Sequence, residues 1–230
     1  MSGGALGRHD DRGSIERGGL GFWPRVRAIC RALESEDRDQ LPSLARTSPE
    51  ARVGGCRLRY GGALSILIRP ESTSDHDAIR SLTARAFAGL SFSDGSEPRV
   101  IDKLREAEAL AVSLVAVVRD RVVGHIAFSR VGPPALQGWF ALGPVSVEPS
   151  LQRRGVGKQL VEAGLRDLRA QRAKGCVLLG DHRYYRRFGF VVAPTLAPPG
   201  YPAEHFQVLS FGASPPNARV VFHDAFSAEP

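Results

Sequence analysis

The fold is decided by the stretch Val145-Ser146-Val147-Glu148-Pro149-Ser150-Leu151-Gln152-Arg153-Arg154-Gly155-Val156-Gly157-Lys158. Apolar residues at 140–147 predict a strand that Pro149 ends. Apolar residues then recur at helical spacing over 156–168, and the helix is expected to end before Gly175. The stretch therefore reads as a strand, a glycine-containing turn and an amphipathic helix.

The turn has the features of a site for a phosphorylated ligand. Backbone N–H groups in the first turn of a helix have no helical partner, and the helix dipole favours an anion beside them. Gly155 lets a phosphate come close to the backbone, and Gly157 leaves the first turn bare. The turn predicts a pyrophosphate ligand, with a glycine-containing helix start that binds nothing as the alternative.

Two familiar phosphate-binding loops do not fit this turn. A Walker A loop needs a glycine where Gln152 stands and a serine or threonine where Gln159 stands. A dinucleotide-binding turn needs a third glycine where Leu160 stands. The turn therefore belongs to neither class of nucleotide-binding protein.

Positive charge gathers around the same helix. The chain has a formal net charge of +7, and residues 151–187 alone hold ten Lys and Arg against three acidic residues. This asymmetry predicts an anionic partner, either a phosphorylated cofactor or a nucleic acid, unless it is only a solvated helix face. We expect a cofactor rather than nucleic acid, because no basic stretch is interleaved with aromatic residues.

The chain divides into an arm and a domain. Residues 1–63 are rich in Gly and Arg, and we expect a disordered N-terminal arm in which 22–33 has the spacing of a short helix. Residues 64–230 have the regular patterns of one domain. No membrane helix or secretory signal is expected. Three scattered cysteines predict neither disulfides nor zinc, so we expect a cytoplasmic protein without a metal.

Strand and helix patterns alternate through the domain. Asp75 is expected to cap one helix and Ser96-Glu97-Pro98 to open the next. After the helix at 156–168, residues 184–188 are expected to form a short further helix. Hairpins followed by a strand–helix–strand crossover predict an α/β fold with a mixed, mostly antiparallel central sheet flanked by helices. Besides 140–147, strands are expected at 64–69, 112–118, 122–128, 176–179, 190–192, 206–211 and 220–222.

Two motifs together resemble a known family. The strand end Val145-Ser146-Val147-Glu148-Pro149 and the turn that follows it are similar to the acetyl-CoA signature of the GNAT superfamily. Leu178-Leu179-Gly180-Asp181, followed by Tyr184-Tyr185-Arg186-Arg187-Phe188-Gly189-Phe190, is similar to the family's second half. Gly124-His125-Ile126-Ala127-Phe128-Ser129 resembles the bacterial YhbS-like branch in particular. The resemblance covers residues 66–226.

The resemblance implies a fold, a cofactor and a reaction. The central sheet would be splayed in its middle, and acetyl-CoA would lie in the split. Val145 and Val147 would offer backbone groups to the pantetheine and to the acetyl carbonyl. The acetyl group would pass directly to an amine on a small molecule or a peptide. The remaining cofactor contacts would come from Gln152, Arg153, Arg154, Gly155, Val156, Gly157 and Lys158.

The same resemblance implies three catalytic tasks. The backbone N–H of Val147 would stabilise the oxyanion. Tyr185 would donate to the departing thiolate, unless it is only a packed aromatic residue. The family's glutamate base falls at Ala141, which cannot serve, so Glu97 and His125 are the candidate bases. Glu97 has a structural alternative as an acid in a first helical turn, and His125 has one as a buried strand residue.

An N-acetyltransferase that binds both substrates together is therefore the expected function. The missing family glutamate keeps a second hypothesis open, a non-catalytic acyl-CoA-binding sensor or scaffold module. We expect the loop at 197–202 to line the acceptor side. The sequence identifies neither the acceptor amine nor the oligomeric state, monomer or homodimer.

Overall fold

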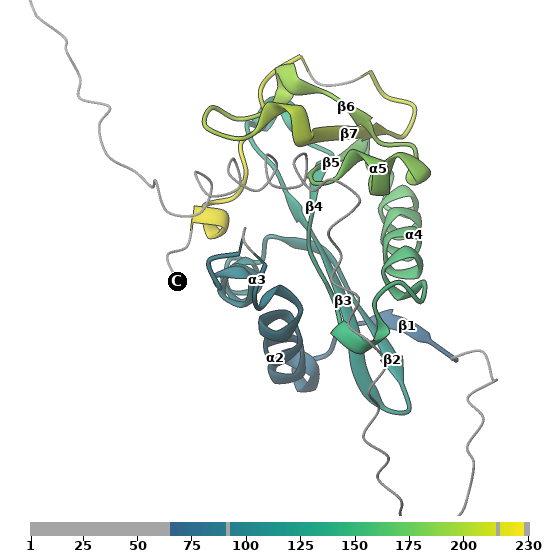
Figure 1. The fold of residues 1–230 in the computed structure, drawn as a ribbon. Helices are drawn as coiled ribbons and strands as arrows, with labels where there is room; N and C mark the ends of the chain where they lie inside the picture. The colour runs from purple at the N-terminus through teal and green to yellow at the C-terminus, as the bar shows by residue number, and fades with distance from the viewer. Residues whose placement is uncertain (1–64, 91–92, 215–216, 228–230) are drawn as a thin grey trace, which may run out of the picture.

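A computed structural model describes residues 65–90, 93–214 and 217–227. The expected arm at 1–63, with its helix at 22–33, lies outside these residues. Within them, strands form a single sheet in the order β1-β2-β3-β4-β5-β7-β6 (Figure 1). The strands are β1 (Leu67–Pro70), β2 (Leu110–Val118), β3 (Arg121–Arg130), β4 (Trp139–Val147), β5 (Gly175–Leu179), β6 (Val191–Val192) and β7 (Phe206–Ser210).

All neighbouring strands pair antiparallel except β4 and β5, which pair parallel. The predicted mixed, mostly antiparallel sheet is therefore confirmed. The helices are α2 (His76–Phe87), α3 (Glu97–Glu106), α4 (Val156–Ala170) and α5 (His182–Tyr185). Short 3₁₀ turns are η1 (Thr73–Asp75), η2 (Pro134–Leu136), η3 (Pro149–Leu151), η4 (Arg186–Phe188), η5 (Pro194–Leu196), η6 (Ala203–His205) and η7 (Asp224–Ser227).

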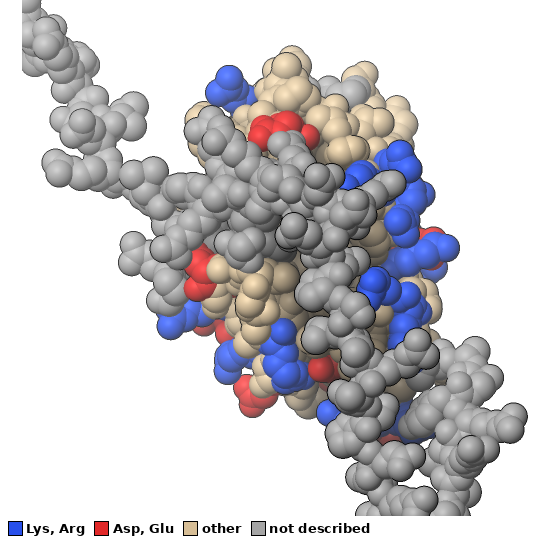
Figure 2. All heavy atoms as spheres, viewed as in Figure 1, with Lys and Arg blue, Asp and Glu red and all other residues tan. Residues whose placement is uncertain are grey.

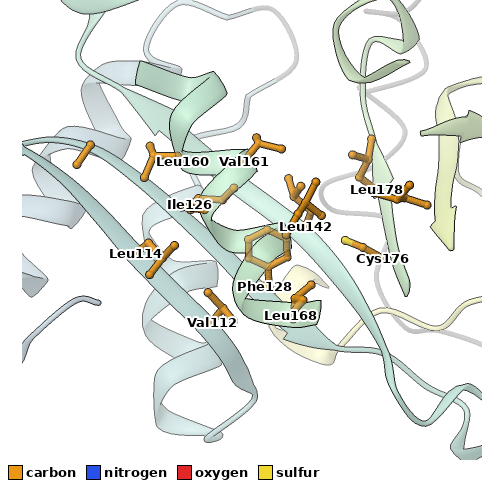
Figure 3. Close-up of a cluster of buried hydrophobic side chains, with 14 of the residues drawn as sticks. Val112, Leu114, Ile126, Phe128, Leu142, Leu160, Val161, Leu168, Cys176 and Leu178 are labelled. Carbon is orange, nitrogen blue, oxygen red and sulfur yellow. The ribbon is translucent and has the colours of Figure 1, made fainter. Parts of the chain in front are cut away.

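Helix α4 lies against one face of the sheet, and α2 and α3 lie on the other (Figure 1). A close approach of α4 is possible because two positions carry no side chain. A Cβ on Gly124 of β3 would lie 2.9 Å from Leu160 Cδ1, and a Cβ on Gly164 of α4 would overlap the ring of Phe128. Figure 3 shows this ring among the buried side chains beneath α4, including Leu168. Tight packing on this face fixes where the helix begins.

A β-bulge divides β4 into two halves. Ile126 of β3 pairs with Val145, whereas Phe128 pairs with Leu142, so β4 holds one extra residue between these pairs. The extra residue changes which positions share a face. Leu142 and Val145 both belong to the α4-facing core, although they are three residues apart. The bulge thus turns Ser146 toward the α2 face of the sheet.

The predicted cap of the first helix is confirmed in position, because Asp75 is the N-cap residue of α2, but not in its side-chain bond. Asp75 is the third residue of η1, which precedes α2, and its carboxylate makes no cap bond to α2. The carboxylate instead accepts from the Ser72 backbone N–H at 2.7 Å and from Arg69 Nη1 at 2.7 Å and Nη2 at 2.9 Å. The Asp75 carboxylate therefore serves the preceding 3₁₀ turn η1, in a capping box with Ser72, rather than the backbone of α2.

The predicted strand at 220–222 was wrong. Val221 forms only an isolated bridge with Gly132, through two backbone hydrogen bonds of 2.8 Å. The preceding residue, Val220, donates to the carbonyl of Leu196 instead. Because its backbone bonds go to two different segments, this apolar stretch cannot form a ladder. The other predicted strands are present with shifted bounds, and the short helix begins earlier, at His182.

Candidate active site

The sheet is splayed between β4 and β5. The parallel pairing covers only three residue pairs, Trp139 with Gly175, Phe140 with Cys176, and Ala141 with Val177. Beyond them β4 continues to Val147 and β5 to Leu179, and the described residues place no strand between them. The splayed sheet expected from the family resemblance is therefore confirmed.

The free edge of β4 presents backbone groups to this split. The N–H of Glu148 donates to the Val123 carbonyl on β3 at 2.9 Å. Consecutive N–H groups of a strand point to opposite sides, so the N–H and C=O of Val147 point away from β3. The same alternation applies to Val145, two residues earlier. Both residues named from the sequence thus turn backbone groups toward the split.

The start of α4 also carries unpaired donors. Its first intrahelical bond runs from the N–H of Gln159 to the carbonyl of Gly155, at 3.0 Å. The N–H groups of Val156, Gly157 and Lys158 therefore have no acceptor within the helix. Val156 offers only this backbone group, because its side chain is buried in the core. This helix start can bind an anion.

Gly155 is needed for its backbone conformation. Its φ of +87° lies in the left-handed region that favours glycine, and a Cβ there would meet no atom within 4 Å. The open space agrees with the expected approach of a ligand. The left-handed backbone conformation of Gly155 was not predicted from the sequence. Arg153, with φ +59°, adopts the left-handed region as well.

Polar side chains surround the turn. Arg153, Arg154 and Lys158 are exposed, and Lys158 Nζ lies 3.7 Å from Glu162 Oε1. Gln152 Nε2 donates to the Val147 carbonyl at 3.3 Å, which ties the turn to the end of β4. Figure 2 shows Lys and Arg atoms gathered along the edge of the molecule where α4 lies. The turn is therefore positively charged and open to solvent.

Tyr185 lies on the same face as α4, half-buried against the core. Its ring packs on Gly180, where a Cβ would lie 2.7 Å from Tyr185 Cε2. The rings of Tyr184 and Phe190 lie 4.9 Å and 5.8 Å from it, centroid to centroid. Burial raises the pKa of the Tyr185 phenol above its ordinary value, so the hydroxyl is protonated and can donate at neutral pH.

Two arginines follow Tyr185, and an inward-pointing guanidinium would lower its pKa. Both Arg186 and Arg187 are exposed, and the Arg187 guanidinium lies over the ring of Tyr184, 4.7 Å from its centroid. Neither arginine lowers the pKa of Tyr185. Tyr185 is therefore suited to donating a hydrogen bond and poorly suited to losing its proton completely.

His125 is fully buried in a polar network on the α2 face. Its Nε2 lies 2.9 Å from Ser113 Oγ and 3.4 Å from Glu71 Oε2. Arg105 Nε and Nη2 donate to the same carboxylate at 2.8 Å and 2.9 Å. Burial lowers the pKa of His125, although the Glu71 carboxylate opposes this. The network gives His125 structural partners that its place in the sequence did not predict.

Glu97 is buried at the start of α3, with 3% of its surface exposed. Its Oε2 accepts from Ser93 Oγ at 2.8 Å, and its Oε1 has no hydrogen-bond partner among the described residues. Burial raises the pKa of Glu97, and the nearby charge of Asp94 raises it further. A carboxylate with one free oxygen and a raised pKa can accept a proton.

The remaining expectations concern Ala141, metals and membranes. Ala141 is buried and pairs with Ser129 and Val177, so this position offers no acid. The described residues bring together no group of His, Cys, Asp and Glu that fits a metal ion. None of the described helices is long and apolar enough to cross a membrane.

Comparison with known proteins identifies the family. The model of the acetyltransferase (GNAT) family matches residues 76–190, which hold β4, the turn, α4 and Tyr185. The chain belongs to the GNAT family. Among curated GNAT relatives, the uncharacterized N-acetyltransferase YhbS of Escherichia coli (strain K12) is 35% identical over 133 residues, which cover 56% of this chain and 75% of that protein. The expected family and enzyme class, an acyltransferase, are confirmed.

Two solved GNAT structures resemble this chain closely enough to compare. A GNAT family acetyltransferase from Brucella melitensis, in complex with acetyl-CoA, is 44% identical with a TM-score of 0.64, covering 70% of this chain and 98% of that one. YhbS from Escherichia coli, in complex with CoA, is 32% identical with a TM-score of 0.63, covering 73% and 94%.

Proposed function

We propose that this chain transfers the acetyl group of acetyl-CoA directly to an amine while both substrates are bound. The observation that carries the proposal is that unpaired backbone donors occur at two places along one strand–turn–helix segment. One is the N–H of Val147 on the free edge of β4, and the other is the first turn of α4. A thioester at the first and a pyrophosphate at the second would satisfy both. The similar Brucella and E. coli proteins were solved with acetyl-CoA and CoA.

The cofactor's binding residues follow from these donors. The amides of Val156, Gly157 and Lys158 are proposed to bind the pyrophosphate, aided by the exposed charges of Arg153 and Arg154. Gly155 provides the left-handed turn that exposes these amides, and Gln152 holds the turn against β4. Val145 and Val147 are proposed to bind the pantetheine as an added strand would, through backbone groups.

Three groups of the chain are proposed to act in the reaction. The N–H of Val147 donates to the thioester oxygen as the amine nitrogen attacks and negative charge develops there. Tyr185 donates to the sulfur as the carbon–sulfur bond breaks. A phenol of ordinary pKa ~10 is a weaker acid than a thiol of pKa ~8.5, and burial widens this gap. Tyr185 therefore stabilises the thiolate mainly by a hydrogen bond.

Glu97 is the proposed base. An amine with the lysine pKa of ~10.4 must lose a proton before it attacks, which costs ~4.6 kcal/mol at pH 7. Glu97 Oε1 and His125 Nδ1 each lack a partner among the described residues, but burial raises the pKa of Glu97 and lowers the pKa of His125. The contrast favours Glu97 over His125.

A Gly155→Glu variant tests the cofactor site. The substitution strains a left-handed residue and puts negative charge beside the proposed pyrophosphate, so CoA affinity should fall by at least about 100-fold. Gly212→Glu is the matched control, because Gly212 has φ +96° and equally open space. Calorimetric titration with CoA measures both variants. Equal affinity in the two variants would remove this turn from the site.

A Tyr185→Phe variant tests the proposed donor. It keeps the ring on Gly180 and deletes only the hydroxyl, so kcat should fall by at least about tenfold with CoA affinity nearly unchanged. Tyr184→Phe is the contrasting variant, because the Tyr184 hydroxyl lies beside the first turn of α4. It is 3.2 Å from where a Cβ of Gly157 would be. Its kcat should stay close to that of the unchanged protein. An unchanged kcat in Tyr185→Phe would end this role.

The sensor hypothesis is tested by turnover. Free thiol released from acetyl-CoA is followed across a panel of small and peptidyl amines. CoA binding without thiol release from any amine would favour a sensor or scaffold module. We take the acceptor to be an amine of a small molecule or peptide and the compartment to be the cytoplasm.

Residues 64–230 are proposed to be the catalytic domain. The family match lies wholly inside it. A chain that begins at Gly62 should bind CoA and turn over like the full protein, as measured by calorimetry and thiol release. A large loss of thermal stability on this truncation would show that residues 1–61 contribute to the fold.

A further inference from the structure

Three buried oxygen atoms at the start of α3 lack hydrogen-bond partners. They are Asp94 Oδ2, Ser96 Oγ and Glu97 Oε1, and no described residue donates to any of them. The side chains of Ser96 and Glu97 are at least nine-tenths buried. Buried polar atoms without partners are uncommon in folded proteins, so three within four residues call for an explanation.

The other polar atoms of this segment are engaged and hold it in place. Asp94 Oδ1 accepts from the Ser96 N–H at 2.9 Å, and Ser93 Oγ accepts from the Gly95 N–H at 3.1 Å. The single hydroxyl proton of Ser93 goes to Glu97 Oε2. Ser96 has helical backbone angles and makes no cap bond with its side chain. The three free oxygens are therefore fixed by their neighbours and cannot be satisfied by them.

The segment opens α3, which packs against α2 on the sheet face opposite α4, and this face includes the splayed half of β4 (Figure 1). The last turns of α2 contact that half, because Ser146 Oγ donates to Thr83 Oγ1 at 3.0 Å and Arg85 Nη2 lies 2.9 Å from Glu148 Oε2. The chain then runs through residues 88–96 into α3. The connection thus starts from α2, a helix that contacts the strand bordering the split.

A chain of contacts also links α3 to β7, which lies next to β5 on the far side of the split. Val100, one turn into α3, belongs to a buried cluster with Phe226. Phe226 packs on Phe222, and Phe222 packs on Phe206 of β7, with ring centroids 5.5 Å and 6.1 Å apart. The first turn of α3 therefore sits between elements that contact β4 and elements that contact β7. A ligand here would meet the split from the side that α4 does not occupy.

We propose that Asp94, Ser96 and Glu97 bind the acceptor as a protonated primary amine, with one N–H for each free oxygen. This inference rests on the proposed acetyl transfer and names its substrate class. A primary ammonium has three N–H donors, no acceptor and a positive charge, which matches three acceptor oxygens of which two belong to carboxylates. An anion or a group with only acceptors would be repelled.

The same contacts prepare the amine for attack. One N–H bond of the ammonium breaks as its proton passes to Glu97, where an O–H bond forms, and the freed lone pair attacks the acetyl carbon. The second N–H proton passes to the departing sulfur as the tetrahedral species collapses, so that the carbon–sulfur bond breaks and the products are the amide and the CoA thiol. The amine would approach the thioester from the α2 face of the sheet, toward which Ser146 points. The N–H of the next residue, Val147, points along the sheet into the split, so the amine and the oxyanion donor approach from different sides.

Kinetics with charged and uncharged amines test the assignment. The probes are butylamine, a short peptide with one lysine and a blocked N-terminus, and aniline, which is uncharged at pH 7. In Glu97→Gln and Asp94→Asn, KM for the charged substrate should rise at least about tenfold, with CoA affinity unchanged. KM for aniline should change little. The two charged probes distinguish a small-molecule acceptor from a lysine side chain.

Glu106→Gln is the matched control, because Glu106 is exposed at the other end of the same helix. It should leave every KM unchanged. Since Glu97→Gln also removes the proposed base, binding of butylamine to the CoA-bound protein is measured by calorimetry as well. Thermal unfolding checks that each variant is folded, and Ser96→Ala offers a milder change with a smaller expected rise in KM.

The outcomes separate the two proposals. If the unchanged protein binds no CoA and releases no thiol, the proposed function fails. If it acetylates amines but prefers aniline to both charged probes, the ammonium site is wrong. If Glu97→Gln and Asp94→Asn turn over with unchanged KM and bind butylamine as before, the site is likewise wrong.

Discussion

Two glutamates lie at opposite ends of α3, Glu71 beside its C-terminal end and Glu97 in its first turn, and their surroundings shift their pKa values in opposite directions. At the C-terminal end, Arg105 binds Glu71 through two hydrogen bonds, His125 lies beside it, and these contacts hold the pKa of Glu71 well below its usual range. At the N-terminal end, Glu97 receives one hydroxyl hydrogen bond, and burial raises its pKa. Both carboxylates are largely shielded from water, since 12% of the Glu71 side chain and 3% of Glu97 are exposed.

The difference shows that burial alone does not assign a role to an acid. The desolvation of both groups opposes ionisation, but Glu71 has enough donors to overcome it and Glu97 does not. A carboxylate that is fully paired stabilises the fold. One that keeps a free oxygen lowers stability and is available to a ligand.

The largest expected effect is a loss of stability on substitution of Glu71, the paired glutamate at the C-terminal end of α3. Glu71→Gln removes the charged partner of Arg105 Nε and Nη2 and leaves Asp102 as the remaining ion-pair partner of this guanidinium, so the free energy of unfolding should fall by about 2 kcal/mol. Urea denaturation at pH 7 measures it. The exposed Glu106→Gln should change stability by less than about 0.5 kcal/mol. Equal values for the two variants would contradict a structural role for Glu71.

Acid titration should show a smaller effect with a definite sign. The pKa of Glu71 is depressed in the folded state, so its contribution to stability is present above the unfolded pKa near ~4.3 and is lost as pH falls further. Stability should therefore decline below about pH 5, by at most ~1.4 kcal/mol per pH unit for this group. Asp75, whose pKa is also lowered, adds to the decline.

The readout is the gap in stability between the unchanged protein and Glu71→Gln, followed from pH 7 to pH 3. It should narrow as the pH falls, because the carboxylate becomes protonated and loses its advantage over the amide. A gap that stays constant would mean that Arg105 and Glu71 do not interact as ions.

The smallest effect is expected at the unpaired end. The pKa of Glu97 is raised in the folded state, so its ionisation opposes folding once the pH exceeds the unfolded pKa near ~4.3. Glu97→Gln should therefore leave stability at pH 7 unchanged or raise it by less than about 1 kcal/mol, and the gain should vanish by pH 4. Chemical denaturation at both values decides. A marked loss of stability at pH 7 would make Glu97 a structural residue like Glu71.

Much of the site could be predicted from the sequence, because the residues that form it are contiguous in the chain. The strand, turn and helix at 140–168 repeat local rules of alternation, punctuation and helical spacing, and the structure has each of them in order. The splayed sheet came from resemblance to a family, since no local pattern states where two strands stop pairing.

The rest depends on contacts between distant residues. Glu71 and Arg105 are 34 residues apart, and nothing near either marks the pair. Asp94 and Ser96 also lacked a signal, because a polar residue before a helix usually serves as a cap. The mistaken strand at 220–222 has the same origin. Its apolar residues fit a strand, but the neighbour that would complete a ladder is a matter of tertiary structure.

The bulge in β4 has a consequence for how this protein can vary. Inserting one further residue between Leu142 and Val145, with the one-residue bulge kept, would exchange inside and outside for every residue that follows in the strand. The hydroxyl of Ser146 would then enter the apolar layer under α4, and the free N–H of Val147 would turn to the strand beside it. A single inserted codon could thus erase the active edge while leaving every proposed site residue in the sequence.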